Sequence, residues 1–171
     1  MKFNLPKKIK AKKFRDNRGY FQECFKENKF KFKPVFSALS YSKKKVIRGL
    51  HFQNKFKQKI FITVLVGKIF DVCVNVDFKS KNFSKIYVNT LQEGDMLYIP
   101  INFAHGFVGM DKKNLIMYQF SNYHHKSSEI GIKYNDKDLN IDWRLTENEV
   151  QLSSKDNNLL FFKDLDSPFK F

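Results

Sequence analysis

The sequence predicts an all-β protein, built as a β-sandwich or barrel. Short segments rich in Val, Ile and Phe recur through the middle of the chain, and turn-forming residues separate them. Their spacing is typical of sandwiches and barrels. An aromatic share of 16% and a hydrophobic share of 42% are enough to form a folded core. A chain of 171 residues fits one domain, which we expect to span residues 1–171.

The strongest strand signal lies in residues 59–78, where Gly67-Lys68 interrupts a nearly continuous apolar run. This pattern predicts a hairpin whose two strands are covered on both faces. Later apolar segments separated by turns predict four more strands, at residues 85–90, 96–99, 106–110 and 115–121. Short helical turns are expected only within residues 16–30 and 153–165.

The formal net charge of +15 is compatible with three kinds of partner: nucleic acid, an anionic membrane surface or a small polyanion such as a nucleoside diphosphate. The lysines are scattered along the chain, which is typical of a solvated surface. No arginine-rich stretch, helix-turn-helix pattern or zinc-finger spacing is present, so we expect no nucleic-acid partner. No apolar run has the length of a signal peptide or membrane helix, so we expect a cytoplasmic protein without membrane contact.

Four histidines are candidates for chemistry, namely His51, His105, His124 and His125. A single histidine beside apolar residues is more often a hydrogen-bonded structural group than a catalyst. The chain has no His-x-His or C-x-x-C spacing, so we predict no metal and no cofactor. Adjacent strand residues point to opposite faces, so His124 and His125 are not expected to enter one site together.

Seven short segments are each a weak signal of a protein family, but their combined order and spacing are highly specific. They are RDNRGYF (15–21), RGLHFQ (48–53), GKIFDVCVNV (67–76), YIPINFAHGFV (98–108), YQFSNYHHKSSEIGIKYND (118–136), LNIDW (139–143) and LSSKD (152–156). Together they resemble the dTDP-4-dehydrorhamnose 3,5-epimerase family, a metal-independent family with a cupin fold. The resemblance covers about residues 14–156.

This resemblance implies a cupin-type jelly roll with a few short peripheral helices and the activity of an isomerase. Its reaction is epimerisation at C3 and/or C5 of a nucleotide-linked 4-keto-6-deoxyhexose of the dTDP-4-dehydro-6-deoxyglucose type, in deoxysugar and cell-surface polysaccharide biosynthesis. A base removes a proton beside the ketone and an acid returns one to the opposite face. His51 falls on the family's base, Asp156 on the carboxylate that orients it, and Tyr118 on the proton donor.

The resemblance also implies a set of substrate contacts and a homodimer with exchanged N-terminal strands. Arg18, Phe21 and Glu23 fall on positions that reach in from the neighbouring subunit to hold the nucleotide. Arg48 falls on a diphosphate contact, and a guanidinium fork suits phosphate oxygens. Further expected contacts are Tyr123, which stacks on the base, and His105, Glu129 and Lys155.

Several positions depart from the family pattern. The family's lysine that supports the enolate oxygen falls on Ile60, and Lys59 lies one position earlier. A shift of one residue turns a strand side chain to the opposite face, so Lys59 is expected to contact substrate only if the strand shifts register or bulges. The family's following arginine is Thr63 here, and a segment that carries Gln and Asn in the family is Phe36-Ser37-Ala38.

Two other functions stay open beside epimerisation. The altered positions are compatible with a weakened cupin that binds a sugar nucleotide without turnover. A sugar-nucleotide ketoisomerase on the same fold has less support, since such enzymes typically carry a further histidine soon after the first, where this chain has Phe52-Gln53-Asn54. We predict the epimerase, because a base, its orienting carboxylate and an acid have little use together in a pure binding protein.

Overall fold

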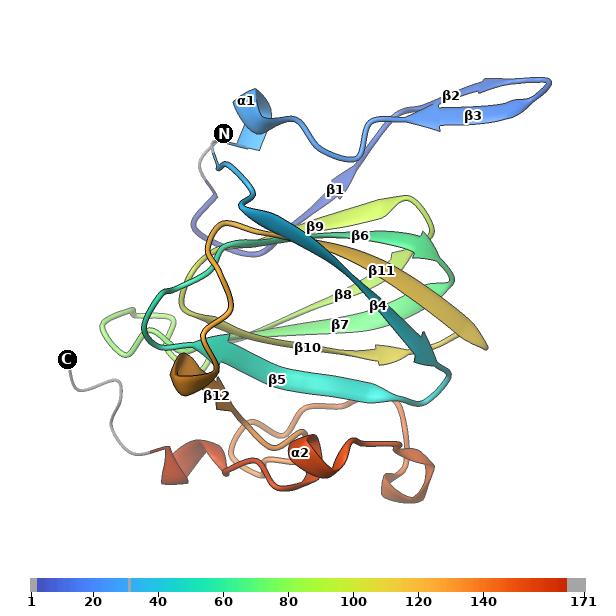
Figure 1. Ribbon diagram of the computed structural model, residues 1–171. Coiled ribbons are helices and arrows are strands. Elements are labelled where there is room, and N and C mark those ends of the chain that lie inside the picture. Colours follow the sequence, from blue (N-terminus) through green and yellow to red (C-terminus); the bar gives the residue numbers. More distant parts are fainter. Residues whose placement is uncertain (1–2, 31, 166–171) are drawn as a thin grey trace.

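Two five-stranded antiparallel sheets face each other in the computed structural model, which describes residues 3–30 and 32–165 (Figure 1). The first sheet has the order β1 (Lys7–Lys10), β9 (Asp95–Ile99), β6 (Ile60–Val66), β11 (Lys113–Phe120) and β4 (Phe36–Lys43). The second has the order β12 (Glu129–Gly131), β5 (Ile47–Gln53), β10 (Phe103–Gly109), β7 (Lys68–Asn75) and β8 (Ile86–Gln92). The predicted all-β sandwich is confirmed.

The remaining elements are short and peripheral. A separate two-stranded hairpin consists of β2 (Lys13–Asp16) and β3 (Gly19–Gln22). The helical turns are α1 (Glu27–Phe30), η1 (Lys126–Ser128), η2 (Glu147–Glu149), α2 (Ser154–Asn157) and η3 (Phe162–Asp164). None of the helices in the described ranges is long and apolar enough to span a membrane.

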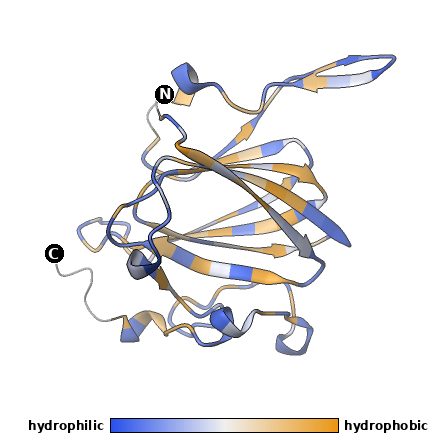
Figure 2. Ribbon diagram, viewed as in Figure 1, coloured by the Kyte–Doolittle hydropathy of each residue, from blue (hydrophilic) through white to orange (hydrophobic). Residues whose placement is uncertain are grey.

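Three apolar clusters fill the space between the sheets and cover their outer faces, and the strands alternate between them (Figure 2). On β7, Ile69 and Cys73 pack between the sheets, whereas Phe70 and Val72 pack on the outer face of the second sheet. The C-terminal segment covers that outer face, with Trp143 as its largest side chain. This double coverage explains why β7 is apolar at nearly every position.

The outer face of the first sheet is covered by the N-terminal segment. Phe25, Phe30 and Phe32 gather around Phe61 of β6, with the Phe30 and Phe61 ring centroids 4.8 Å apart. Burying a phenylalanine stabilises the folded state by about 1.5–3 kcal/mol. The many phenylalanines of this chain therefore attach the N-terminal segment to the barrel.

The structure corrects the predicted hairpin at residues 59–78. Strands β6 and β7 follow one another around Gly67 but belong to different sheets, so they do not pair. Gly67 has a φ of +84°, and a Cβ there would overlap the Lys113 carbonyl oxygen. The glycine thus allows a sharp corner between sheets, and an apolar run on each side of a glycine cannot distinguish a corner from a hairpin turn.

The helical turns expected in residues 16–30 are wrong for the first part of that segment. Residues 19–22 form strand β3, and only Glu27–Phe30 are helical. The Asp16 carboxylate accepts a hydrogen bond from the Arg18 backbone N–H at 2.8 Å, which closes the turn between β2 and β3. The helical turns expected in residues 153–165 are confirmed by α2 and η3.

An irregularity between β5 and β10 determines where two histidines lie. His51 and His105 are direct cross-strand partners, and the register shifts immediately afterwards. Gly49 has a φ of +111°, and a Cβ there would lie 2.5 Å from the His105 carbonyl oxygen and 2.6 Å from Gly106 Cα. The two backbones therefore approach more closely than a side chain would allow, beside both histidines.

We predict that Gly49→Ala is destabilising and that Gly19→Ala is a matched control. Both glycines have positive φ, at +111° and +137°, but a Cβ at Gly19 has nothing within 4 Å. The control should lose about 1–2 kcal/mol of unfolding free energy from backbone strain alone. Gly49→Ala should lose about 1–3 kcal/mol more, because β5 must move from β10. Urea unfolding measures both, and equal losses would contradict the close approach.

Candidate active site

One cavity of about 410 Å³ opens between the sheets at the end where β5, β10 and β11 present polar side chains. Its walls combine residues from both sheets with residues from α2 and the segment before β12. The cavity brings together these predicted site residues: Arg48, His51, His105, Tyr118, Glu129, Lys155 and Asp156. These side chains, which are distant in the sequence, therefore share one site.

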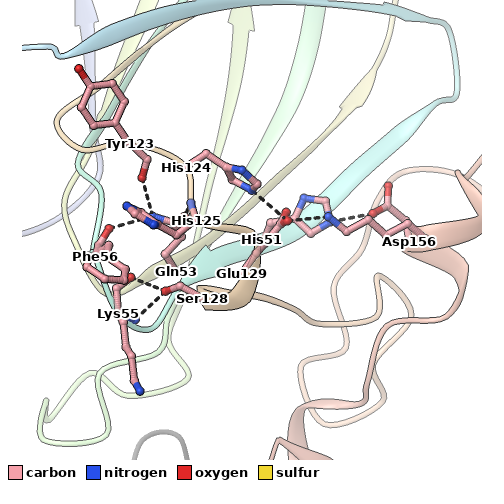
Figure 3. A network of polar contacts seen from close by, with 11 residues as sticks. His51, Gln53, Lys55, Phe56, Tyr123, His124, His125, Ser128, Glu129 and Asp156 are labelled. Atoms are coloured by element: carbon pink, nitrogen blue, oxygen red, sulfur yellow. Dashed lines mark hydrogen bonds and ion pairs between the residues drawn. The ribbon is translucent and has the colours of Figure 1, made fainter.

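His51 and Asp156 form the first polar pair in this cavity. His51 Nε2 lies 2.7 Å from Asp156 Oδ1 (Figure 3). Asp156 is buried in the first turn of α2, where its backbone N–H donates to Ser153 Oγ at 3.0 Å. Burial raises the pKa of Asp156, but hydrogen bonds and charge from His51 outweigh that effect and hold the pKa below its ordinary value. An ionised carboxylate thus holds the imidazole in place.

Glu129 organises the mouth of the cavity next to this pair (Figure 3). Its Oε2 accepts hydrogen bonds from Lys155 Nζ at 2.7 Å and from His124 Nε2 at 3.1 Å. Burial raises the pKa of Glu129, and the bonds from Lys155 and His124 outweigh this to lower it. His124 was not expected here, and it lies in a loop before η1 rather than in a strand.

Tyr118 lies on the opposite wall, since β11 belongs to the first sheet and β5 to the second. Burial, followed by the nearby Asp71 carboxylate, raises the pKa of Tyr118 well above its ordinary value. The phenol therefore keeps its proton at neutral pH. In this position it can donate a proton to a ligand from the side opposite to His51.

A second histidine–carboxylate pair lies deeper, and sequence analysis missed its carboxylate. His105 Nε2 is 2.6 Å from Asp71 Oδ2, and Cys73 Sγ donates to Asp71 Oδ1 at 3.5 Å. All three residues are buried. The available signal was a lone aspartate within the apolar strand FDVCV, because a buried carboxylate needs a partner. Burial raises the pKa of the Cys73 thiol well above its ordinary value.

Asp71, Cys73 and His105 are also possible metal ligands, with ligand atoms within 4.8 Å of one another. Two ligands of a tetrahedral zinc ion, each about 2.0 Å from the metal, lie about 3.3 Å apart. The distance of 2.6 Å between His105 and Asp71 is shorter and is that of a charge-assisted hydrogen bond. This geometry favours a histidine–carboxylate pair that shares a proton.

Aromatic rings continue from Tyr118 to the rim of the cavity. The Tyr118 and Phe120 rings are nearly parallel at 5.7 Å, and Phe120 stacks on Phe36 at 4.6 Å. Phe36 in turn stacks on Tyr123 at 6.1 Å, and Tyr123 is 60% exposed. Phe36 and Tyr123 do not line the cavity itself, but the row of rings that starts at Phe120 ends in the exposed ring of Tyr123, on which an aromatic base can stack.

The positions that depart from the family pattern divide between the two faces of the first sheet. Ile60 and Ala38 line the cavity. Lys59 lines a different hollow, beside Tyr98 and Pro100, and its backbone N–H bonds to Ser121. The pairing of β6 with β11 is regular from Ile60 to Val64 and shows no bulge that would turn Lys59 inward, and a substrate contact of Lys59 stays a prediction. Thr63 is buried on the opposite face from Ile60, next to Met96 and Met117 in register.

The three residues expected from a neighbouring subunit lie away from the cavity of their own chain. Arg18 and Phe21 belong to the β2–β3 hairpin, which extends from the barrel (Figure 1). Arg18 pairs with Asp16 at 2.7 Å, and Glu23 pairs with Lys26 at 2.7 Å. Phe21 is 67% exposed. Their predicted contact with the nucleotide stays a prediction.

The fold is a cupin-type jelly roll with an internal cavity. The sequence profile described as dTDP-4-dehydrorhamnose 3,5-epimerase matches residues 5–164. The dTDP-4-dehydrorhamnose 3,5-epimerase of Escherichia coli K12 is 35% identical over 167 residues, which cover 92% of this chain and 89% of the relative.

Solved structures agree with this similarity. The dTDP-6-deoxy-D-glucose-3,5-epimerase of Legionella pneumophila, in complex with dTDP-4-keto-L-rhamnose, has a TM-score of 0.91 at 34% identity, covering 96% of this chain and 91% of that one. The Bacillus anthracis dTDP-4-dehydrorhamnose 3,5-epimerase, with TDP and PPi bound, has a TM-score of 0.87 at 32% identity, covering 92% and 94%. The chain belongs to the dTDP-4-dehydrorhamnose 3,5-epimerase family, whose members are isomerases.

We predict that the stability lost in Asp156→Asn depends on pH. Because the pKa of Asp156 is lowered on folding, its stabilising contribution is complete above about pH 4, the ordinary aspartate value, and disappears as pH falls through the folded pKa. The substitution should cost about 1 kcal/mol at pH 7 and less at pH 3. Urea unfolding at both pH values measures this, and a cost that is constant or rises on acidification would contradict the assignment.

Proposed function

We propose that this protein epimerises a nucleotide-linked 4-keto-6-deoxyhexose at C3 and/or C5. The observation that carries the proposal is the placement of His51, held by Asp156, and protonated Tyr118 on opposite walls of one cavity. Inversion of a carbon requires removal of a proton from one face and delivery of a proton to the other. A base and an acid on facing sheets match this requirement.

The proposed mechanism begins with proton removal by His51. Its imidazole takes the proton from the carbon beside the ketone, and the electrons of the C–H bond move to give an enolate. Asp156 stabilises the imidazolium that forms. Tyr118 then donates its proton to the opposite face of the same carbon and restores the ketone. A positioned acid or base typically contributes ~10²–10⁴-fold in rate.

We assign nucleotide binding to Arg48 and the rim of the cavity. Hydrogen bonds from Nε to Ser42 Oγ at 2.8 Å and from Nη2 to the Tyr41 carbonyl at 3.0 Å fix the Arg48 guanidinium. The remaining N–H groups are available for phosphate oxygens. Tyr123 supplies a stacking surface for the base. The bound TDP of the Bacillus anthracis relative and the net charge of +15 support an anionic nucleotide ligand.

We further propose a homodimer in which each β2–β3 hairpin completes the site of the other subunit. The hairpin extends from its own barrel, and no side chain from it lines the cavity of its own chain. Leu39 and Tyr41 are exposed on β4, at 65% and 50%, and give the first sheet an apolar edge for a second copy. Arg18 and Phe21 would then contact the nucleotide from the partner.

The proposed function predicts that deuterium from D₂O is incorporated into dTDP-4-keto-6-deoxyglucose. NMR at the two carbons beside the ketone measures this exchange. Exchange at both carbons indicates a 3,5-epimerase, and exchange at one indicates a single-centre enzyme. His51→Ala should abolish the exchange and leave nucleotide affinity within about threefold, because only the base is removed. His125→Ala is the matched control, since its ring stacks on Phe56 and does not line the cavity.

Full exchange in His51→Ala would exclude His51 as the base. Absence of exchange in the unmodified protein, with dTDP still bound, would instead indicate a sugar-nucleotide binding protein.

Subunit complementation tests the exchanged hairpins. Arg18→Ala and His51→Ala should each be inactive alone. After the two are mixed and allowed to exchange subunits, half of the dimers are heterodimers, each with one intact site. About a quarter of the sites should therefore regain activity. If each hairpin instead completes the site of its own subunit, mixing the two variants restores no deuterium exchange. Recovered exchange activity therefore distinguishes the two arrangements.

A further inference from the structure

If the proposed function holds, the reaction passes through an enolate, and the negative charge on its oxygen needs a positive group beside it. Enzymes commonly stabilise developing oxyanions with fixed hydrogen-bond donors in a site that excludes water. Ile60, where the family lysine would stand, is apolar and lines the cavity. Another group must therefore supply the donor.

The cavity is lined by a small set of cationic or titratable side chains, and most of them are already engaged. His51 is paired with Asp156 as the base. Lys155 and His124 share Glu129, and both are exposed at the mouth. Arg48 is exposed and bonded to β4. Among the described residues this leaves His105, which is 7% exposed.

His105 bonds to a carboxylate that has no contact with solvent. Asp71 is fully buried, and a buried carboxylate is costly unless a cation and hydrogen bonds compensate it. His105 Nε2 lies 2.6 Å from one oxygen of Asp71 and can compensate this carboxylate, and the Cys73 thiol donates to the second oxygen at 3.5 Å. With Nε2 committed to Asp71, the described residues offer Nδ1 no hydrogen-bond partner, so Nδ1–H is available to a ligand.

We propose that the His105 imidazolium, held and charged by Asp71, donates Nδ1–H to the enolate oxygen and replaces the missing lysine. Asp71 is a positioning residue, since it acts through His105. The location suits this role: His105 is opposite His51 on β10, and its ring lies 6.2 Å from that of Tyr118. The oxygen of a ketone held between base and acid would thus lie within reach of His105, on the same wall as His51.

The test compares exchange kinetics on dTDP-4-keto-6-deoxyglucose in His105→Gln, alone and combined with Ile60→Lys. His105→Gln should lower kcat about 10²–10³-fold with KM changed less than about threefold, because the donor acts on the transition state. Adding Ile60→Lys should recover at least about tenfold of that loss. Ile60→Lys combined with His51→Ala should recover nothing, because a new cation does not replace a base.

A pH profile separates positioning from structural support in Asp71→Asn. The titratable and charged groups facing His105 are Asp71 and Cys73 on β7, Arg48 and His51 on β5, and Tyr118 on β11. In this variant the imidazolium loses its counter-charge, so the fall of kcat on the alkaline side should begin at lower pH than in the unmodified protein. If Asp71 has a purely structural role, Asp71→Asn lowers kcat at all pH values and leaves the pH at which the alkaline fall begins unchanged.

Each result decides for or against the proposal. The proposal is overturned if His105→Gln keeps kcat within twofold while His51→Ala is inactive, a result that leaves the epimerase function intact. It is also overturned if Ile60→Lys gives no recovery in His105→Gln. Should Asp71→Asn not fold, the His105→Gln pair carries the decision alone. Absence of exchange in the unmodified protein rejects the proposed function itself.

Discussion

The close approach of β5 and β10 is the constraint on which the site depends. Gly49 and Gly106 allow the two backbones to meet without side chains between them, and the register shift follows directly after the pair His51 and His105. Cross-strand partners point to the same face of a sheet, so both imidazoles enter one cavity. Two residues more than fifty positions apart in the sequence thereby become neighbours, and every later step in the site uses their placement.

Each of these histidines has its own carboxylate, and the two pairs differ in depth. Asp156 reaches His51 from α2, outside the sheets, whereas Asp71 reaches His105 from the neighbouring strand β7. Tyr118 faces both from the other sheet, where burial and the Asp71 charge keep its proton in place. The outer pair is suited to accept a proton, because its imidazole lines the cavity and the Asp156 carboxylate can stabilise the imidazolium that forms. The deeper pair is suited to hold positive charge, because its carboxylate has no contact with solvent.

Features that local sequence patterns determine could be predicted from the sequence, whereas features that depend on contacts between distant residues could not. Apolar runs located β6 to β11, yet they could not assign β6 and β7 to different sheets, because a run buried on both faces has no preferred partner. Strand periodicity predicted that the side chains of Lys59 and Ile60 lie on opposite faces of the sheet, and they line different hollows. Asp71 was missed because its partner lies 34 residues away, and no spacing rule connects them. The matched segments, rather than any single histidine, identified the candidate site.

The altered wall of the cavity can be interpreted from the cost of its polar groups. A buried ion pair is often no more stabilising than apolar residues of the same volume, so a site without function has no physical need for one. This cavity is apolar at Ile60 and Ala38 and aromatic at Phe107 and Phe120, yet it holds two histidine–carboxylate pairs. Stability alone would favour apolar replacement of the pairs as well. The combination therefore favours a working proton-transfer site with a modified sugar-facing wall over a binding protein derived from an enzyme.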